Sequence, residues 1–163
     1  MTPSSVILSA YRAPMRTLSV DDGTAAEWAI ATGVVGLDGA VPTKAECLDE
    51  VLTAVDLELD ERTARRIRRF TLAPAGSLVW TRDRSGGLHL GRLGRGQRYA
   101  HDADAHQLGL PHQRDCDWAA GPVPAGLVPA AVIETFARGG RNWQQIRADG
   151  GASALLWEQL DGA

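Results

Sequence analysis

The sequence contains little cysteine, a single lysine and no long apolar stretch. Its two cysteines, Cys47 and Cys116, are too few for a disulfide framework, and neither belongs to a C-x-x-C pair of the kind that binds zinc or exchanges disulfides. We expect both to be buried thiols. No segment approaches the roughly 18–20 consecutive apolar residues of a transmembrane helix. The N-terminal segment also lacks the basic start and apolar run of a signal peptide. We therefore expect a cytoplasmic protein with no membrane partner.

Common catalytic motifs are also missing. The sequence has no G-x-S-x-G elbow, no phosphate-binding G-x-x-x-x-G-K-[ST] loop and no H-E-x-x-H zinc motif. The only lysine, Lys44, has Pro42 two positions before it, which excludes the acidic-x-lysine motif of common nucleases. We therefore expect a protein that is not an enzyme and has neither a catalytic residue nor a cofactor.

The chain has the length and composition of one globular domain. Its 163 residues are 44% hydrophobic and 23% charged, enough apolar material to form a core. We expect a single domain over 1–163.

The charges are segregated along the chain. Residues 1–61 carry a net charge of −8 and residues 115–163 carry −3, whereas residues 62–114 hold eleven arginines against three aspartates, a net charge of +8. Genomic composition bias explains part of the arginine content but not its clustering. Because guanidinium groups match phosphate oxygens, this basic middle third favours a nucleic-acid partner.

Hydrophobic periodicity predicts five helices. Gly33 is placed to end the first of them, and Thr43-Lys44-Ala45-Glu46 has capping-box spacing before the second. On the third helix, four arginines at i, i+3, i+4 and i+7 form one face, which is either solvated or binds phosphate: Arg62, Arg65, Arg66 and Arg69. The predicted helices are about 24–32, one through Leu48 to Val55, one from Asp60 or Thr63 through Phe70, one near 129–137 and one near 152–160.

Alternating residues predict the strands. We expect strands at Val6 to Leu8 with Tyr11, at 34–37, at 77–82 and 88–93 as a hairpin, and at 113–118. Gly94-Arg95-Gly96 is suited to bend the sheet so that 97–99 continues it. The fold class that we expect is α+β, with a compact and strongly bent sheet and peripheral helices.

Histidines and acidic residues cluster in one segment. His101, Asp102, Asp104 and His106 have the composition of a metal site, but the segment is typical of a solvated polar loop, so we expect no metal.

The order of several motifs resembles the EVE-like, PUA-superfamily domain at the N-terminus of Mrr-type modification-dependent restriction endonucleases. The resemblance covers about residues 8–146, followed by a short helical extension over 147–163. The matching pieces, in order, are Gly33-Val34-Val35-Gly36-Leu37, Arg69-Phe70, Gly76-Ser77-Leu78-Val79-Trp80-Thr81-Arg82, Leu90-Gly91-Arg92-Leu93 with Tyr99, His112-Gln113-Arg114-Asp115-Cys116-Asp117-Trp118, and Val123-Pro124.

The resemblance implies a small, strongly bent PUA-like β-barrel that reads a modified base by drawing it into an aromatic pocket. The implied base pocket comprises Trp80, Thr81, Arg82, Tyr99, Trp118, Asp117, Leu37 and Asp38. Many relatives have isoleucine-glycine-tryptophan after the position of Gly36, where this chain has Leu37-Asp38-Gly39. Either another aromatic residue, such as Trp80 or Trp143, replaces the missing tryptophan, or the ligand differs.

We therefore expect a non-catalytic reader of a modified base, in DNA rather than RNA, with its effector supplied by a separate protein. Phosphate contacts are expected from Arg65, Arg69, Arg92, Arg95, Arg98, Arg114, Arg138, Arg141 and Asn142. Two alternatives remain open. The first is a protein-interaction adaptor that has lost base reading. The second is an enzyme acting on a nucleotide, with Asp38, Asp117 or a histidine of 101–112 as its acid or base.

Overall fold

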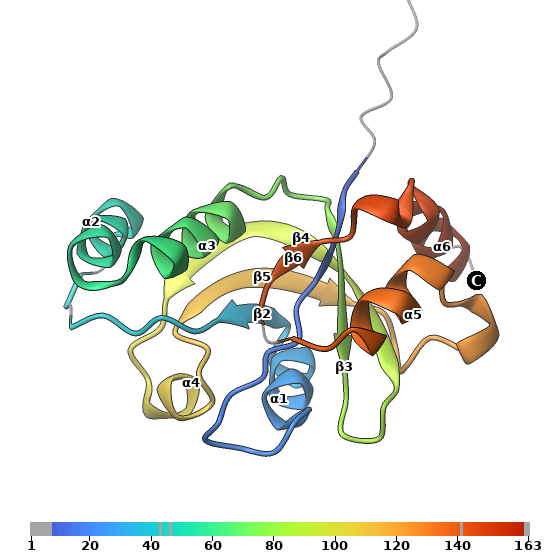
Figure 1. Cartoon of the computed structure of the whole chain (residues 1–163), viewed down its shortest axis with the longest axis horizontal. Helices are drawn as coiled ribbons and strands as arrows, with labels where there is room; N and C mark the ends of the chain where they lie inside the picture. Colours follow the sequence, from blue (N-terminus) through green and yellow to red (C-terminus); the bar gives the residue numbers. More distant parts are fainter. Residues whose placement is uncertain (1–7, 43, 46, 141, 162–163) are drawn as a thin grey trace, which may run out of the picture.

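The computed structural model describes residues 8–42, 44–45, 47–140 and 142–161, which form a mixed α+β fold around one six-stranded sheet (Figure 1). The strand order is β2-β5-β4-β3-β1-β6, in which β1 is parallel to β3 and the other pairs are antiparallel. The strands are β1 (Ala10–Arg12), β2 (Val34–Leu37), β3 (Leu78–Arg82), β4 (Leu88–Tyr99), β5 (His112–Trp118) and β6 (Gln144–Gln145).

The expected closed barrel is wrong. Over the described residues, β2 and β6 are the two edges of the sheet and do not pair with each other. Closure requires the two edge strands to hydrogen-bond. Here β6 has only two residues and pairs with β1, at the opposite edge of the sheet from β2. Sequence alternation identifies individual strands but not which of them lie at the edges.

The predicted bend of β4 is confirmed. Register with β5 shifts between Leu93 and Gln97, and the strand then continues to Tyr99. Gly96 lies directly against Asp115, since a β-carbon on Gly96 would be 1.9 Å from the Asp115 Oδ2. A larger residue at this position of the bend would have to displace the exposed Asp115 side chain.

In the described part of the chain the helices are α1 (Thr24–Thr32), α2 (Leu48–Glu58), α3 (Glu61–Leu72), α4 (Ala103–Gln107), α5 (Ala130–Ala137) and α6 (Ala152–Asp161), with 3₁₀ turns η1 (Ala125–Leu127) and η2 (Arg147–Asp149). Five of the helices were predicted, and Gly33 ends α1 in the left-handed conformation at φ 73° as expected. The predicted capping box includes Thr43 and Glu46, which lie outside the described residues.

The segment predicted as a polar loop contains a short helix instead. The Asp102 carboxylate accepts a hydrogen bond from the Ala105 amide, 3.1 Å away, and so caps α4. The first strand is Ala10–Arg12, whereas Val6 of the predicted strand lies outside the described residues. Cys116 is buried, which raises the pKa of its thiol, but Cys47 is exposed, contrary to expectation.

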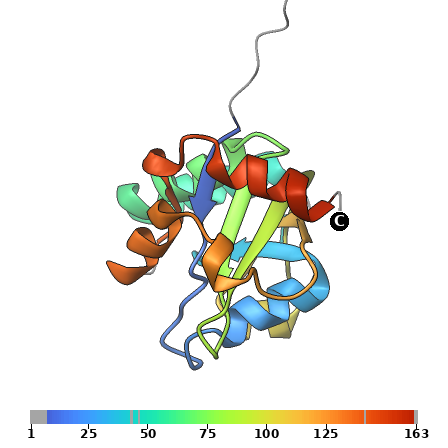
Figure 2. The ribbon, with the colours of Figure 1, turned by 90° about the vertical axis from the view of Figure 1, so that its right-hand side faces the viewer.

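Two apolar cores lie on opposite sides of the sheet. Figure 2 shows the ribbon with α6 in front of the strands. The first is formed with helices α1, α2 and α3, whose buried residues include Ala29, Val55 and Ile67. The second is formed with α5 and α6, through residues such as Val132 and Leu156. The sheet is therefore covered by helices on both sides. Its edge strand β6 lies close to α3 and α5.

Candidate nucleic-acid interface

A hollow on the described surface lies between α3, the end of α5 and the segment from Asn142 to Ala148. It consists of two adjoining concavities of about 680 Å³ and 590 Å³, which share Arg69, Trp143 and Gln144. We call the two together the arginine groove. Its charged lining residues are Asp60, Glu61, Arg62, Arg65, Arg66, Arg69, Glu134, Arg138 and Arg147.

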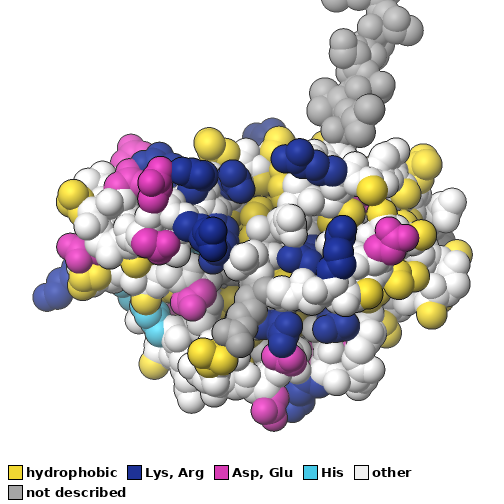
Figure 3. Space-filling model, viewed as in Figure 1, with side chains coloured by type: hydrophobic (Ala, Val, Ile, Leu, Met, Phe, Trp, Pro, Cys, Tyr) yellow, Lys and Arg dark blue, Asp and Glu magenta, His cyan; other side chains and the backbone are white. Residues whose placement is uncertain are grey.

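The arginine groove is basic because of the way α3 packs. One side of this helix packs against the core through Ala64, Ile67 and Phe70. The arginines therefore lie on its outer side. Figure 3 shows basic side chains gathered over α3 and across the face toward α5. Arg138 follows α5, and Arg147 belongs to η2.

Several of these guanidinium groups are available to a ligand. Arg65 is paired with Glu61 at 2.6 Å. By contrast, Arg62, Arg69, Arg138 and Arg147 form no ion pair with any residue in the described part of the chain. With six arginines against three carboxylates, the lining favours an anionic ligand.

Aromatic rings lie along the floor of the groove. Tyr11 and Trp143 stack with their ring centroids 4.6 Å apart and their planes 16° from parallel. Phe70 meets Trp143 edge to face at 5.1 Å. Trp143 is buried, and its indole Nε1 has no hydrogen-bond partner among the described residues. Tyr11 is only half-buried, which places an aromatic ring within reach of a ligand in the groove.

Four of the predicted phosphate-binding residues line this groove: Arg65, Arg69, Arg138 and Asn142. Arg141 lies outside the described residues. Arg92 and Arg95 line a different, open concavity beside the bend of β4, together with Asp115 and Asp117. Arg98 is paired with Asp115 at 2.9 Å. The structure thus divides the predicted phosphate contacts between two surfaces.

Arg114 supports the groove wall from inside. It is only 2% exposed, and its Nη1 donates to the carbonyls of Phe70 at 2.9 Å and Ala73 at 2.5 Å, while Nη2 donates to that of Gly94 at 2.9 Å. Burial lowers the pKa of this guanidinium. A cation is favourable at the C-terminal end of α3, where the helix carries partial negative charge. Arg114 is therefore occupied in holding α3 and is not available to a phosphate.

The predicted base pocket is not assembled in this structure. Trp80 pairs with Leu90 in the β3–β4 ladder, and Trp118 pairs with Gly91 in the β4–β5 ladder. Because Leu90 and Gly91 are consecutive residues of β4, the two indoles lie on opposite sides of the sheet. Trp80 is fully buried, and its Nε1 donates to the Ser153 Oγ at 2.8 Å. Trp80 therefore belongs to the second core.

The other predicted pocket residues are also dispersed. Thr81 is fully buried, and the guanidinium of Arg82 lies 5.8 Å from the centre of the Phe136 ring. The Tyr99 hydroxyl hydrogen-bonds the Val41 backbone at 3.1 Å. Leu37 is buried and Asp38 exposed, while Asp117 and Trp118 line a separate concavity on another side.

The histidines are engaged with the backbone. His101, His106 and His112 surround the Tyr99 ring edge to face, and each makes an Nε2 hydrogen bond to a main-chain carbonyl. Within the described ranges, no three His, Cys, Asp or Glu side chains are grouped to hold a metal ion.

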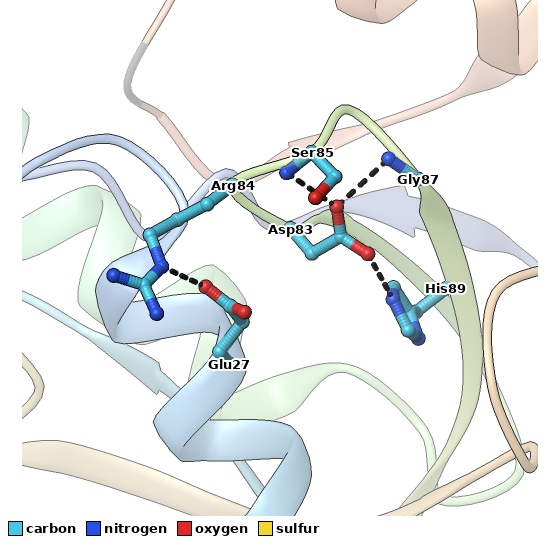
Figure 4. A network of polar contacts seen from close by, with 6 residues as sticks. All are labelled: Glu27, Asp83, Arg84, Ser85, Gly87 and His89. Atoms are coloured by element: carbon cyan, nitrogen blue, oxygen red, sulfur yellow. Dashed lines mark hydrogen bonds and ion pairs between the residues drawn. The ribbon is translucent and has the colours of Figure 1, made fainter.

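An aspartate–histidine pair at the β3–β4 turn is the nearest approach to a catalytic arrangement (Figure 4). Asp83 lies 2.8 Å from the His89 Nε2 and accepts from the amides of Ser85 and Gly87. Burial alone would raise the pKa of the Asp83 carboxyl, but these hydrogen bonds lower it below its usual value. Arg84 ties the turn to Glu27 of α1. Through these contacts Asp83 holds both ends of the turn between β3 and β4.

Comparison of the chain with protein-family models and with curated proteins finds no match. Across the residues that the structure describes, no helix combines the length and apolarity needed to span a membrane.

Sequence reasoning identified the arginines of α3 but missed Tyr11, Gln144, Gln145 and Arg147. No sequence pattern near these residues indicates that they lie in a groove. They reach it only because the two-residue strand β6 pairs with β1.

Proposed function

We propose that the protein is a non-catalytic nucleic-acid-binding reader that holds a modified base of DNA in the arginine groove. The observation that carries the proposal is the meeting of unpaired arginines from three elements with the stacked pair of Tyr11 and Trp143. Arginines bind the phosphate backbone, and aromatic rings stack on bases removed from the helix.

In this proposal, different residues of the groove contact different parts of the nucleotide. Arg62 and Arg69 would bind phosphates along α3, and Arg138 and Arg147 would bind them on the other wall. A flipped base would stack on Tyr11, which Trp143 supports from behind. The exposed amides of Gln144 and Gln145 offer donors and acceptors to the base edge.

This assignment modifies the pocket implied by the family resemblance. Trp143 takes the role of the missing tryptophan, and Tyr11 replaces Trp80 and Trp118 as the stacking partner. The resemblance to EVE-like domains remains the reason to propose a modified base and DNA. The arginine groove supports binding of nucleic acid in general.

The test is fluorescence polarisation with matched duplexes that contain cytosine, 5-methylcytosine or 5-hydroxymethylcytosine, together with a structured RNA, at two salt concentrations. We expect one modified duplex to bind more tightly than the others at both salt concentrations. The preference should be lost in Tyr11→Leu and kept in Tyr11→Phe, which retains the ring.

Equal binding of all duplexes, or a preference unchanged in folded Tyr11→Leu, would contradict base reading in this groove. Tighter binding of the RNA would contradict the choice of DNA. Circular dichroism of each variant establishes that it is folded.

A further inference from the structure

The concavity that Asp117 and Trp118 line has a volume of about 460 Å³. It lies at the C-terminal end of β5, between the loop 119–124 and the last turns of α6. Two tryptophans and two aspartates line it, and we call it the acidic indole pocket. Its lining residues are Asp117, Trp118, Ala119, Ala120, Gly121, Pro122, Val123, Pro124, Trp157, Leu160 and Asp161.

The two indoles are held in place by the fold. The Trp118 Nε1 donates to the Val34 carbonyl at 2.9 Å, and its ring lies against Gly91, where a β-carbon would be 2.6 Å from Cε3. Trp157 is anchored in the second core with 8% of its surface exposed. The indole walls are therefore fixed before any ligand arrives, which reduces the entropic cost of binding.

The charge of this pocket is opposite to that of the arginine groove. None of the described residues that line it is a lysine, arginine or histidine. Asp161 is exposed and forms no ion pair with a described residue. It lies four residues after Trp157 on α6, so the two side chains are neighbours on the helix surface. Asp117 pairs with Arg92 across the β4–β5 ladder and also lines the concavity that contains Arg92 and Arg95. The C-terminal end of α6, which carries partial negative charge, also lies here. The lining therefore repels phosphate and attracts a cation.

We infer that the acidic indole pocket binds an arginine side chain from a peptide segment of a partner protein. A planar guanidinium stacks on indole rings and donates two parallel hydrogen bonds to a carboxylate, whereas an ammonium offers only a point charge. The pocket thus supplies both groups that arginine recognition uses. This contact is independent of nucleic-acid binding and gives the protein a means of recruiting a separate protein.

The test uses the full chain and three acetylated, amidated tripeptides with arginine, lysine or citrulline between two glycines. Citrulline has nearly the shape of arginine without its charge. Binding is followed by NMR through the indole N–H signals, assigned with Trp118→Phe and Trp157→Phe. We expect the arginine peptide to shift the signal of Trp118 or Trp157 and to bind about tenfold more tightly than the citrulline peptide, with lysine between them.

Charge variants make the test specific to this pocket. Asp161→Asn should weaken binding of the arginine peptide by about threefold or more. Glu158→Gln is the matched control, because it removes an exposed acidic residue of α6 that does not line the pocket. Duplex binding should be unchanged in Asp161→Asn, so failure of this inference is distinguishable from failure of the proposed function.

Equal binding of the arginine and citrulline peptides, or no shift of either indole signal, would overturn the inference. Self-association of the protein that Asp161→Asn abolishes would also overturn it, because the occupant would then be a second copy of this chain.

Discussion

The ring of Tyr11 stacks on the indole of Trp143, although the two residues lie near opposite ends of the chain. Tyr11 belongs to β1, which pairs with β6 directly after Trp143. Aromatic stacking and strand pairing thus stabilise the same contact, and together they build the floor of the arginine groove. The predictions below separate the residues on which ligand binding in the groove depends from those on which the stability of the fold depends.

The first prediction concerns the salt dependence of DNA binding. Arg69→Gln removes one unpaired guanidinium from the groove and should make the slope of log K against log salt less steep by about one unit. Arg68→Gln is the control, because Arg68 of the same helix is paired with Asp56 and does not line the groove. Equal slopes for Arg69→Gln and the parent protein would remove Arg69 from the phosphate contacts.

The second prediction concerns Arg114. Arg114→Met leaves the carbonyls of Phe70, Ala73 and Gly94 without their donor and should lower the free energy of unfolding by on the order of 3 kcal/mol. Urea denaturation measures this change. Arg95→Met, at an exposed position of β4, should change stability little. Similar stabilities for the two variants would show that Arg114 does not hold the end of α3.

The third prediction concerns the contact between Gly91 and Trp118. In Gly91→Ala the new β-carbon would be 2.6 Å from the Cys116 Sγ and from the Trp118 Cε3, which forces both to move. We expect a loss of roughly 1–3 kcal/mol in unfolding free energy and a shifted Trp118 indole signal. Gly126→Ala has open space at its β-carbon and is the control. A variant as stable as the control, with an unshifted signal, would contradict this packing.

The fourth prediction concerns pH. Burial lowers the pKa of His112 below its ordinary value of 6.5, against the opposing effects of its hydrogen bond to Gly39 and the nearby Asp38; His106 lowers it further. Below about pH 6.5 the unfolded chain therefore binds a proton at this site that the folded protein binds less readily. Stability should fall as the pH decreases through this range.

Urea denaturation between pH 8 and pH 5 measures that dependence. His112→Gln removes the titrating ring and should show a smaller loss of stability between pH 7 and pH 5 than the parent protein. It should also be less stable at pH 8, because the 2.7 Å hydrogen bond to the Gly39 carbonyl is altered. An unchanged pH dependence would remove His112 as its source.

Local sequence patterns predicted most of the secondary structure because the signals for these elements lie within them. Gly33 ends α1, alternation marks the hairpin of β3 and β4, and glycines permit the bend before Gln97. The segment of α4 was misread because a short polar helix with one buried residue, Ala105, has little hydrophobic periodicity.

The site was predicted only in part. The i, i+3, i+4, i+7 spacing identified the arginine face of α3, because helical geometry alone places those residues together. The aromatic pocket predicted around Trp80 and Trp118 is not assembled, because the strand register places these two side chains on opposite sides of the sheet. The resemblance to a barrel-forming family also did not indicate that the sheet would be open.

The sequence by itself determined five of the helices, most of the strands and a basic α3, because these depend on contacts between residues close in the chain. Only the tertiary structure decided that Arg114 is buried under α3 while Arg69 is exposed in the groove, and that Tyr11 meets Trp143. Those outcomes depend on strand order and on which side of the sheet each residue faces. Both are set by long-range pairing and burial, which a local pattern does not encode.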